Sequence, residues 1–216
     1  MSTLFLASSF DKTIDKFIEK VKPLPDQAKV AFIDSAADPY RDSWDLFWVE
    51  NDRKAFLDNG FKISEVNLHD FKNLSETEIE NFLSGFDILH MCGGHTKYLM
   101  YLIHINKFYR PLKEFILSGK LIYTGTSAGS MVVAPSLAEV GRLDDEIDVK
   151  YWPEHNQEHL QGLSLVDFLI LPHFNNPDFI ESNYESIKST NYPHPLIFLN
   201  DNQAILAQNG KFEIVQ

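Results

Sequence analysis

Cysteine, positive charge and long apolar runs are all scarce in this sequence. Cys92 is the single cysteine in 216 residues, which excludes an intramolecular disulfide framework and a thiolate zinc cluster. Lys and Arg number 19 against 31 Asp and Glu, a net charge of −12, which argues against a protein that coats nucleic acid because that task needs a basic face. No window approaches the roughly 18 apolar residues of a membrane span, and the start lacks the cationic region of a signal peptide. We therefore expect a cytoplasmic protein with neither a nucleic acid nor a membrane partner.

Short β-branched or aromatic runs alternate with helix-like stretches along the whole chain. The expected strands are 3–7, 29–34, 61–68, 86–91, 121–125, 168–171, 196–199, 204–208 and 212–215. The expected helices are 11–21, 44–59, 75–83, 96–118 (bent near Arg110 and Pro111) and 178–189, with a long loop over 144–161. This alternation predicts a single α/β domain over residues 1–216, a three-layer fold in which helices cover both faces of a mostly parallel sheet. Sites in such sheets lie beyond the carboxyl ends of the strands.

The sharpest local motif follows the strand at 121–125. Gly125-Thr-Ser127-Ala-Gly129 matches the G-x-S-x-G elbow, in which a tight strand-to-helix turn lifts a serine hydroxyl above the sheet. The small neighbours are needed because a larger Cβ would collide with adjacent backbone. A plain glycine-rich turn with a capping serine is the alternative reading of the five-residue pattern alone.

Two later strand ends supply a base and an acid. Leu171-Pro172-His173 places a histidine where a buried strand ends, and a nucleophilic serine needs such a base. Asp201 follows the apolar run at 196–199 and could hold the histidine tautomer. The rival acids are three adjacent carboxylates in the long loop, namely Asp144, Asp145 and Glu146. In α/β-hydrolases the acid lies between serine and histidine, so either the acid is in this loop or the scaffold is a different one.

Paired glycines end the strand at 86–91. Glycine lets backbone N–H groups approach a substrate closely, so the Gly94 N–H could bind an oxyanion. The Ala128 N–H, just after the serine, would be the second donor. The segment lacks both the G-x-G-x-x-G pattern and the Walker lysine of phosphate-binding loops.

Taken in order, these motifs resemble those of peptidase E (aspartyl dipeptidase) and its relatives, including cyanophycinase. The matching segments are Cys92-Gly-Gly-His95, Thr126-Ser-Ala-Gly-Ser130, Leu171-Pro-His-Phe174 and Asn200-Asp-Asn-Gln-Ala204, and the resemblance runs over about residues 4–215. The family's acid is usually Glu where this chain has Asp201, and Asn is common at the position of His95.

The resemblance implies a serine peptidase on a fold like that of class I glutamine amidotransferases, a flavodoxin-like architecture. Ser127 would be the nucleophile, His173 the general base and Asp201 the orienting acid. The expected oxyanion and substrate-binding residues are Gly93, Gly94, His95, Ala128 and Asn175. The resemblance further implies cleavage of short peptides with no metal or other cofactor, and we expect a monomer or homodimer. The alternatives are an esterase or amidase with the same triad, and a non-catalytic ligand-binding module.

Three other features receive structural interpretations. His155 and His159 are four residues apart but have no assignable third ligand, so we do not expect a metal site there. Cys92 ends an apolar strand and is expected to be buried. An aromatic run, composed of Tyr40, Trp44, Phe47 and Trp48, is expected to belong to the core or to a subunit contact.

Overall fold

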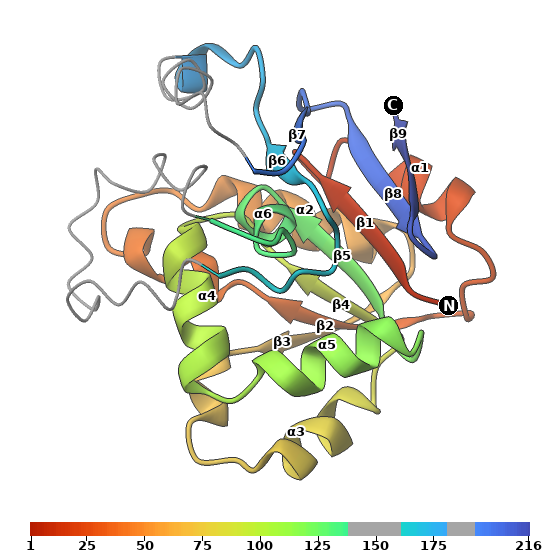
Figure 1. Ribbon diagram of the computed structural model, residues 1–216, viewed down its shortest axis with the longest axis vertical. Coiled ribbons are helices and arrows are strands. Elements are labelled where there is room, and N and C mark those ends of the chain that lie inside the picture. Colours follow the sequence, from red (N-terminus) through yellow and green to blue (C-terminus); the bar gives the residue numbers. More distant parts are fainter. Residues whose placement is uncertain (138–160, 181–192) are drawn as a thin grey trace.

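A seven-stranded sheet forms the centre of the structure, a computed structural model that describes residues 1–137, 161–180 and 193–216 (Figure 1). The strands are β1 (Thr3–Ala7), β2 (Lys29–Ile33), β3 (Lys62–Val66), β4 (Ile88–Met91), β5 (Ile122–Thr126), β8 (Ala204–Gln208) and β9 (Lys211–Val215). Their order is β3-β2-β4-β5-β1-β8-β9. The first five run parallel, whereas β8 and β9 form an antiparallel hairpin at the β1 edge. The predicted mostly parallel sheet is confirmed.

Helices cover both faces of this sheet (Figure 1). They are α1 (Ile14–Lys20), α2 (Phe47–Asp58), α3 (Glu76–Leu83), α4 (Thr96–Ile105), α5 (Tyr109–Leu117) and α6 (Ala128–Met131), with 3₁₀ turns η1 (Ser35–Tyr40), η2 (Leu68–Phe71) and η5 (Pro177–Phe179). One core joins the sheet to α3, α4, α5 and α6, and a second joins the opposite face to α1 and α2. No helix among the described residues is both long and apolar enough to cross a membrane.

The side chains of strand β2 alternate between the two cores. Val30 and Phe32 pack in the core of α1 and α2, whereas Ala31 and Ile33 pack in the other. Successive strand residues point to opposite faces. A strand covered on both sides is therefore apolar at every position after its first residue, as β2 is.

The helical region predicted over 96–118, with a bend near Arg110 and Pro111, consists of two separate helices, so the position of the bend is wrong. Asn106 ends α4, and Lys107 adopts a positive φ of 57°, which stops the helix before Phe108. Pro111 is not the point of the bend. It lies in the first turn of α5, where a missing N–H costs no helical hydrogen bond.

Other differences concern the ends of elements and the placement of one strand pair. Helix α2 begins at Phe47, later than expected, and α3 begins with the predicted capping box at Ser75. The strands β6 (Leu169–Leu171) and β7 (Leu196–Phe198) pair with each other in a separate two-stranded parallel sheet. The expected loop at 144–161 lies almost wholly, and the expected helix at 178–189 mostly, outside the described residues.

The aromatic run is not part of the core at every position. Trp44 is 62% exposed and Phe47 59% exposed, so the core interpretation is wrong for both. Trp48 is half-buried and lies edge-on to the Phe47 and Tyr40 rings.

A fully buried phenylalanine in the core of α1 and α2 allows a test of the packing. The Phe10 ring is stacked 4.6 Å from Phe56 and lies 4.9 Å from His90, between centroids. We predict that Phe10→Ala lowers the free energy of unfolding by about 3–5 kcal/mol, because it leaves a cavity among rigid rings. The control is Phe212→Ala, a ring that is 50% exposed, where a loss less than half as large is expected. Urea unfolding of both variants measures the difference, and equal losses would contradict the packing.

Candidate active site

Ser127 occupies the tight turn between β5 and α6. Its φ of 48° and ψ of −109° are rare for a residue with a side chain. The Ser127 N–H donates to the Ala7 carbonyl oxygen at 3.0 Å, which ties this turn to the end of β1. A Cβ on Gly129 would lie 2.0 Å from the Met91 carbonyl oxygen, so only glycine allows α6 to begin this close to β4. The predicted strand, turn and helix are all present.

His173 lies beside Ser127. Its Nε2 is 3.0 Å from the Ser127 Oγ, and its Nδ1 is 2.6 Å from the Asp201 Oδ1. In this geometry Nδ1–H donates to the carboxylate and Nε2 accepts from the serine hydroxyl. The imidazole stacks on the Phe179 ring, 4.5 Å between centroids and 20° between planes, which fixes its tilt.

Asp201 follows β7 and is surrounded by donors. The Asn176 Nδ2 donates to its Oδ2 at 3.0 Å, and the Lys12 Nζ lies 3.7 Å from the same oxygen. The hydrogen bond and charge of His173 lower the pKa of the Asp201 carboxyl well below its ordinary value, against the opposing effect of partial burial. Hydrogen bonds from Ser8 and Asn176 lower this pKa further. The group is therefore an anion held in a fixed orientation.

Ser8 joins the base to the acid, and sequence reasoning missed it. This residue directly follows β1 and is fully buried. The Ser8 Oγ accepts the His173 backbone N–H at 2.8 Å and donates to the Asp201 Oδ1 at 2.9 Å. The rule that sites lie at the carboxyl ends of parallel strands could have indicated it, because β1 ends at Ala7.

Asn175 and Asn176 have different surroundings. Asn176, which was not predicted, bonds to Asp201, whereas the predicted Asn175 is exposed, with a positive φ of 67°. Among the described residues, Asn175 makes no hydrogen bond to Ser127, His173 or Asp201. A substrate-binding role for Asn175 stays a prediction.

The glycine pair after β4 lies against the serine turn. A Cβ on Gly93 would be 3.2 Å from the Ser127 Cβ and 3.6 Å from the Thr126 carbonyl oxygen, so Gly93 packs closely against this turn. Gly94 has a φ of 147°, and a Cβ there would lie 2.2 Å from the Ala36 carbonyl oxygen, so only glycine is accommodated. Within residues 1–137, 161–180 and 193–216, neither the Gly94 N–H nor the Ala128 N–H donates to another residue. Both donors are thus available to a bound group.

His95 has a local structural task. It is 3% exposed, its N–H donates to the Ala36 carbonyl oxygen at 2.8 Å, and its Nδ1 accepts the Tyr98 N–H at 3.1 Å. The imidazole therefore caps the N-terminus of α4. The expectation that His95 contacts substrate stays a prediction.

A buried polar network lies beneath the serine turn. Asp52, on α2, is 1% exposed, and its Oδ2 accepts the Thr126 hydroxyl at 2.6 Å and lies 3.2 Å from the His90 Nε2. The other His90 nitrogen lies 2.9 Å from the Thr124 Oγ1. Because Thr126 precedes Ser127, this network anchors the end of β5 to α2. A buried carboxylate at this depth requires such partners.

Among the described residues, three side chains in this same region are close enough to share a metal ion. Ligand atoms of Asp52, His90 and Cys92 lie within 4.8 Å of one another, and all three residues are buried. Burial, followed by the charge of Asp52, raises the pKa of the Cys92 thiol well above its ordinary value. A protonated thiol and a carboxylate already bonded to Thr126 suit a hydrogen-bonded core better than a metal site.

Five residues considered above, as alternative acids or as metal ligands, lie outside the described part of the chain. They are Asp144, Asp145, Glu146, His155 and His159. Asp201 therefore remains the candidate acid whose geometry is described.

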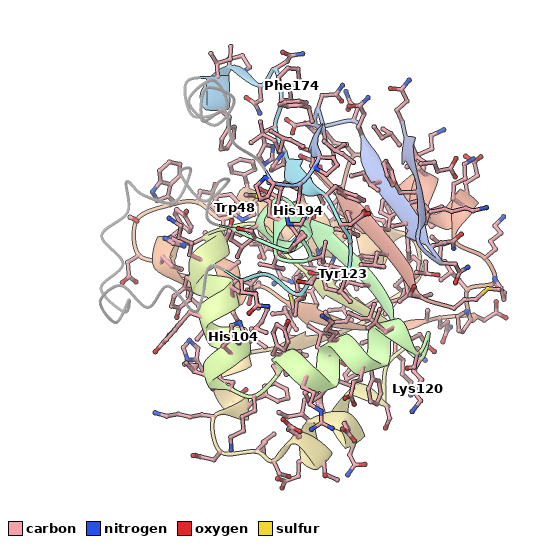
Figure 2. All side chains as sticks on the ribbon, viewed as in Figure 1. Trp48, His104, Lys120, Tyr123, Phe174 and His194 are labelled. Carbon is pink, nitrogen blue, oxygen red and sulfur yellow. The ribbon has the colours of Figure 1, made fainter. Side chains whose placement is uncertain are left out.

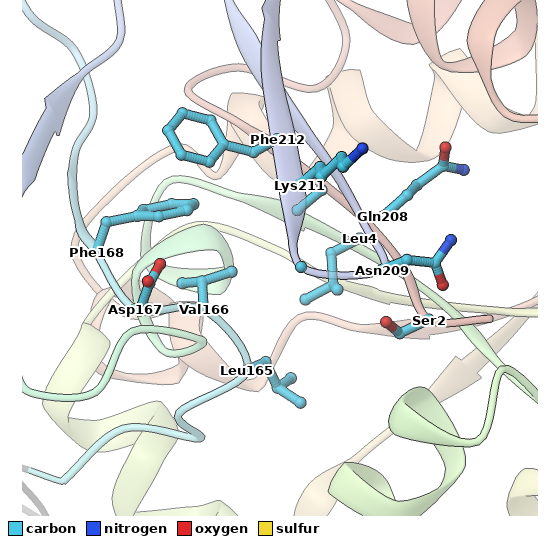
Figure 3. Close-up of a pocket in the computed structure, with 12 residues that line it drawn as sticks. Ser2, Leu4, Leu165, Val166, Asp167, Phe168, Gln208, Asn209, Lys211 and Phe212 are labelled. Carbon is cyan, nitrogen blue, oxygen red and sulfur yellow. The ribbon is translucent and has the colours of Figure 1, made fainter.

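A small hollow elsewhere on the surface does not belong to this site. Figure 3 shows it lined by residues at the start of β1, at the β8–β9 turn and around Phe168. Its volume is about 50 Å³, and it lies toward the opposite end of β1 from Ser8. It is too small for a peptide.

Comparisons with known proteins point to peptidases. The sequence model of peptidase family S51 matches residues 4–215. An uncharacterised peptidase of Pasteurella multocida, PM1590, is 30% identical over 209 residues, which cover 97% of this chain and 95% of that protein. Peptidase E of Nostoc sp. is 28% identical over 158 residues, 73% of this chain and 57% of that protein. A solved structure from Listeria monocytogenes EGD-e, described as a candidate peptidase E, matches with a TM-score of 0.84 at 26% identity, covering 100% of this chain and 98% of that chain.

The lowered pKa of Asp201 predicts how its contribution to stability depends on pH. A carboxyl group whose pKa is lower in the folded than in the unfolded state stabilises the fold above the unfolded pKa of about 3.9, and that contribution is lost as the pH falls. We expect the difference in free energy of unfolding between the parent and Asp201→Asn to shrink as the pH falls below about 4. Urea unfolding at a series of pH values measures it, with the exposed Asp26→Asn as control. A difference that grows as the pH falls below about 4 would contradict the assignment.

Proposed function

The chain belongs to peptidase family S51 and is a serine-type peptidase, and we propose that it cleaves short peptides by a Ser-His-acid mechanism. The observation that carries the mechanism is the continuous set of contacts from Ser127 through His173 to Asp201, at 3.0 and 2.6 Å. Both distances are those of hydrogen bonds, and the base is held in the tautomer that the reaction needs.

The first half of the reaction forms an acyl-enzyme. The Ser127 Oγ attacks the peptide carbonyl carbon while the His173 Nε2 takes the hydroxyl proton. The Gly94 and Ala128 N–H groups bind the oxyanion of the tetrahedral intermediate. The carbon–nitrogen bond then breaks, and His173 returns the proton to the leaving amine, which leaves the acyl group as an ester on Ser127.

The second half releases the acyl group. A water molecule gives a proton to His173 and attacks the ester carbonyl, and His173 then protonates the Ser127 Oγ as the ester bond breaks. Asp201 keeps its charge throughout and stabilises the imidazolium. Ser8 and Asn176 hold the carboxylate, so they are positioning residues.

The proposal of short substrates rests on the resemblance to peptidase E and on a Drosophila melanogaster relative named probable alpha-aspartyl dipeptidase, 31% identical over 86 residues. It does not extend to the identity of the side chain next to the cleaved bond. Two cations on this side of the molecule already have carboxylate partners. Lys12 lies 3.7 Å from Asp201, and Arg41 pairs with Asp34 and Asp38. We therefore assign no preference for an acidic residue. The family assignment favours hydrolysis over the non-catalytic alternative.

Removing the nucleophile tests the proposal. We predict that Ser127→Ala lowers kcat on a dipeptide library to below about a thousandth of the parent value, because the attacking oxygen is lost. The melting temperature should change little, since the turn is held by backbone bonds. Hydrolysis and thermal melts are measured on the same preparation, with simple acyl esters assayed in parallel. Retained peptide turnover in a folded Ser127→Ala protein would refute a serine mechanism, and turnover of esters alone would favour the esterase alternative.

A matched pair of substitutions tests the acid. Asp201→Asn should lower kcat at least about 100-fold, because the amide no longer holds the His173 tautomer. Asp144→Asn, the same change at a rival position, should leave kcat within about threefold of the parent. Steady-state kinetics at one pH compares them, and the reverse result would move the acid to the 144–146 loop.

A further inference from the structure

An indole contacts the peptide group that joins Gly93 to Gly94. The Trp48 Nε1–H, from the first turn of α2, donates to the Gly93 carbonyl oxygen at 3.1 Å. On the other side of Gly94, the His95 N–H donates to the Ala36 carbonyl oxygen at 2.8 Å. Ala36 lies in η1 and Trp48 in α2, so a single segment of chain is hydrogen-bonded to the backbone on both sides of Gly94.

The carbonyl that Trp48 binds and the proposed oxyanion donor belong to the same peptide unit. A trans peptide is planar, so the Gly93 C=O and the Gly94 N–H point in opposite directions. A hydrogen bond that fixes the oxygen therefore fixes the direction of the N–H. The indole lies behind this peptide, on the side away from the group that the N–H would bind.

Two glycines in succession make such a restraint necessary. A peptide flanked by glycines can rotate about both neighbouring bonds at little steric cost. An oxyanion donor is effective only when it is aimed beforehand at the position of the developing charge. A hydrogen bond to the carbonyl also polarises the amide, which makes its N–H a stronger donor.

We propose that Trp48 is a positioning residue that aims the Gly94 N–H at the reaction oxyanion through the Gly93 carbonyl. This inference rests on the proposed function. Trp48 would not touch the substrate, because its polar atom is used by Gly93 and its ring lies against Phe47 and Tyr40. Figure 2 shows Trp48, His194 and Phe174 toward the carboxyl ends of the strands, and Lys120 toward the other end.

The chain offers a matched control four residues away. Trp44 is 62% exposed and lies edge-on to the Tyr40 ring, 6.1 Å between centroids. Among the described residues, its indole nitrogen makes no hydrogen bond. Trp44→Phe therefore makes the same chemical change without removing a bond to the glycine pair.

The experiment compares Trp48→Phe, Trp48→Gln and Trp44→Phe with the parent. Phenylalanine keeps a ring and removes the N–H, whereas glutamine removes the ring and keeps a side-chain N–H donor. Measured quantities are kcat and KM on a dipeptide substrate, the inhibition constant of a peptidyl boronic acid, whose tetrahedral adduct carries oxygen in the oxyanion position, and the melting temperature.

We expect Trp48→Phe to lower kcat about 10- to 100-fold and to weaken boronate inhibition by a similar factor, with KM changed less than about threefold. Glutamine at position 48 should keep more of the kcat than phenylalanine does, and Trp44→Phe should match the parent. A role in packing alone would lower the melting temperature and leave the kcat of the folded protein unchanged.

Each remaining outcome decides against the inference in a distinct way. If the parent's turnover depends on Ser127 and the kcat of Trp48→Phe stays within about threefold of the parent value, this inference alone would be overturned. Failure of both position-48 variants to fold would also overturn it, since the indole would then serve the fold. Absence of turnover in the parent would overturn the proposed function, and this inference with it.

Discussion

The parallel pairing of β1 with β5 is the constraint on which the rest of the site depends. In this register Ala7 lies opposite Thr126, so the Ala7 carbonyl oxygen accepts both the Ser127 N–H and the Ser130 hydroxyl. One residue further along, Ser8 holds the His173 backbone and the Asp201 carboxylate. A slip of one residue would turn Ser8 toward the opposite face of the sheet and separate it from both.

Strained backbone at the site is balanced by contacts around it. Ser127 and His173 both have positive φ, a conformation that costs of order 1–3 kcal/mol per residue. The backbone N–H of each is nevertheless bonded, to Ala7 and to Ser8 respectively. The buried Asp52 adds a third restraint through Thr126. The strained turns thus bring a hydroxyl and an imidazole together beyond the carboxyl ends of the strands.

Most of the architecture could be predicted from the sequence because it depends on patterns within short segments of the chain. The alternation of apolar runs with helix-like stretches located the strands, and the G-x-S-x-G motif located the turn at Ser127. The contact between His173 and Ser127 agrees with the rule that sites form at the carboxyl ends of strands. These inferences need only short windows of sequence.

The parts that could not be predicted depend on the order and register of strands. Ser8 meets Asp201 because β8 pairs antiparallel with β1, with Ala7 opposite Ala204, and no local pattern encodes that neighbour. Asp52 looks like any acidic residue of an amphipathic helix, yet it is buried beside His90. The end of α4 before Lys107 could not be predicted either, because the apolar residues keep their helical spacing across it. Pro111 predicts a bend at a position where the structure has the first turn of α5.

Covalent labelling of the native protein with a fluorophosphonate would test whether Ser127 is an activated nucleophile, on which the proposed mechanism depends. The reagent phosphonylates an activated serine hydroxyl and releases fluoride, so the adduct can be located by mass spectrometry of the digested chain. A single adduct on the peptide that contains Ser127, absent when His173 is replaced by alanine, is the predicted result. Folded protein that takes up no label, or carries it on another residue, would contradict the assignment.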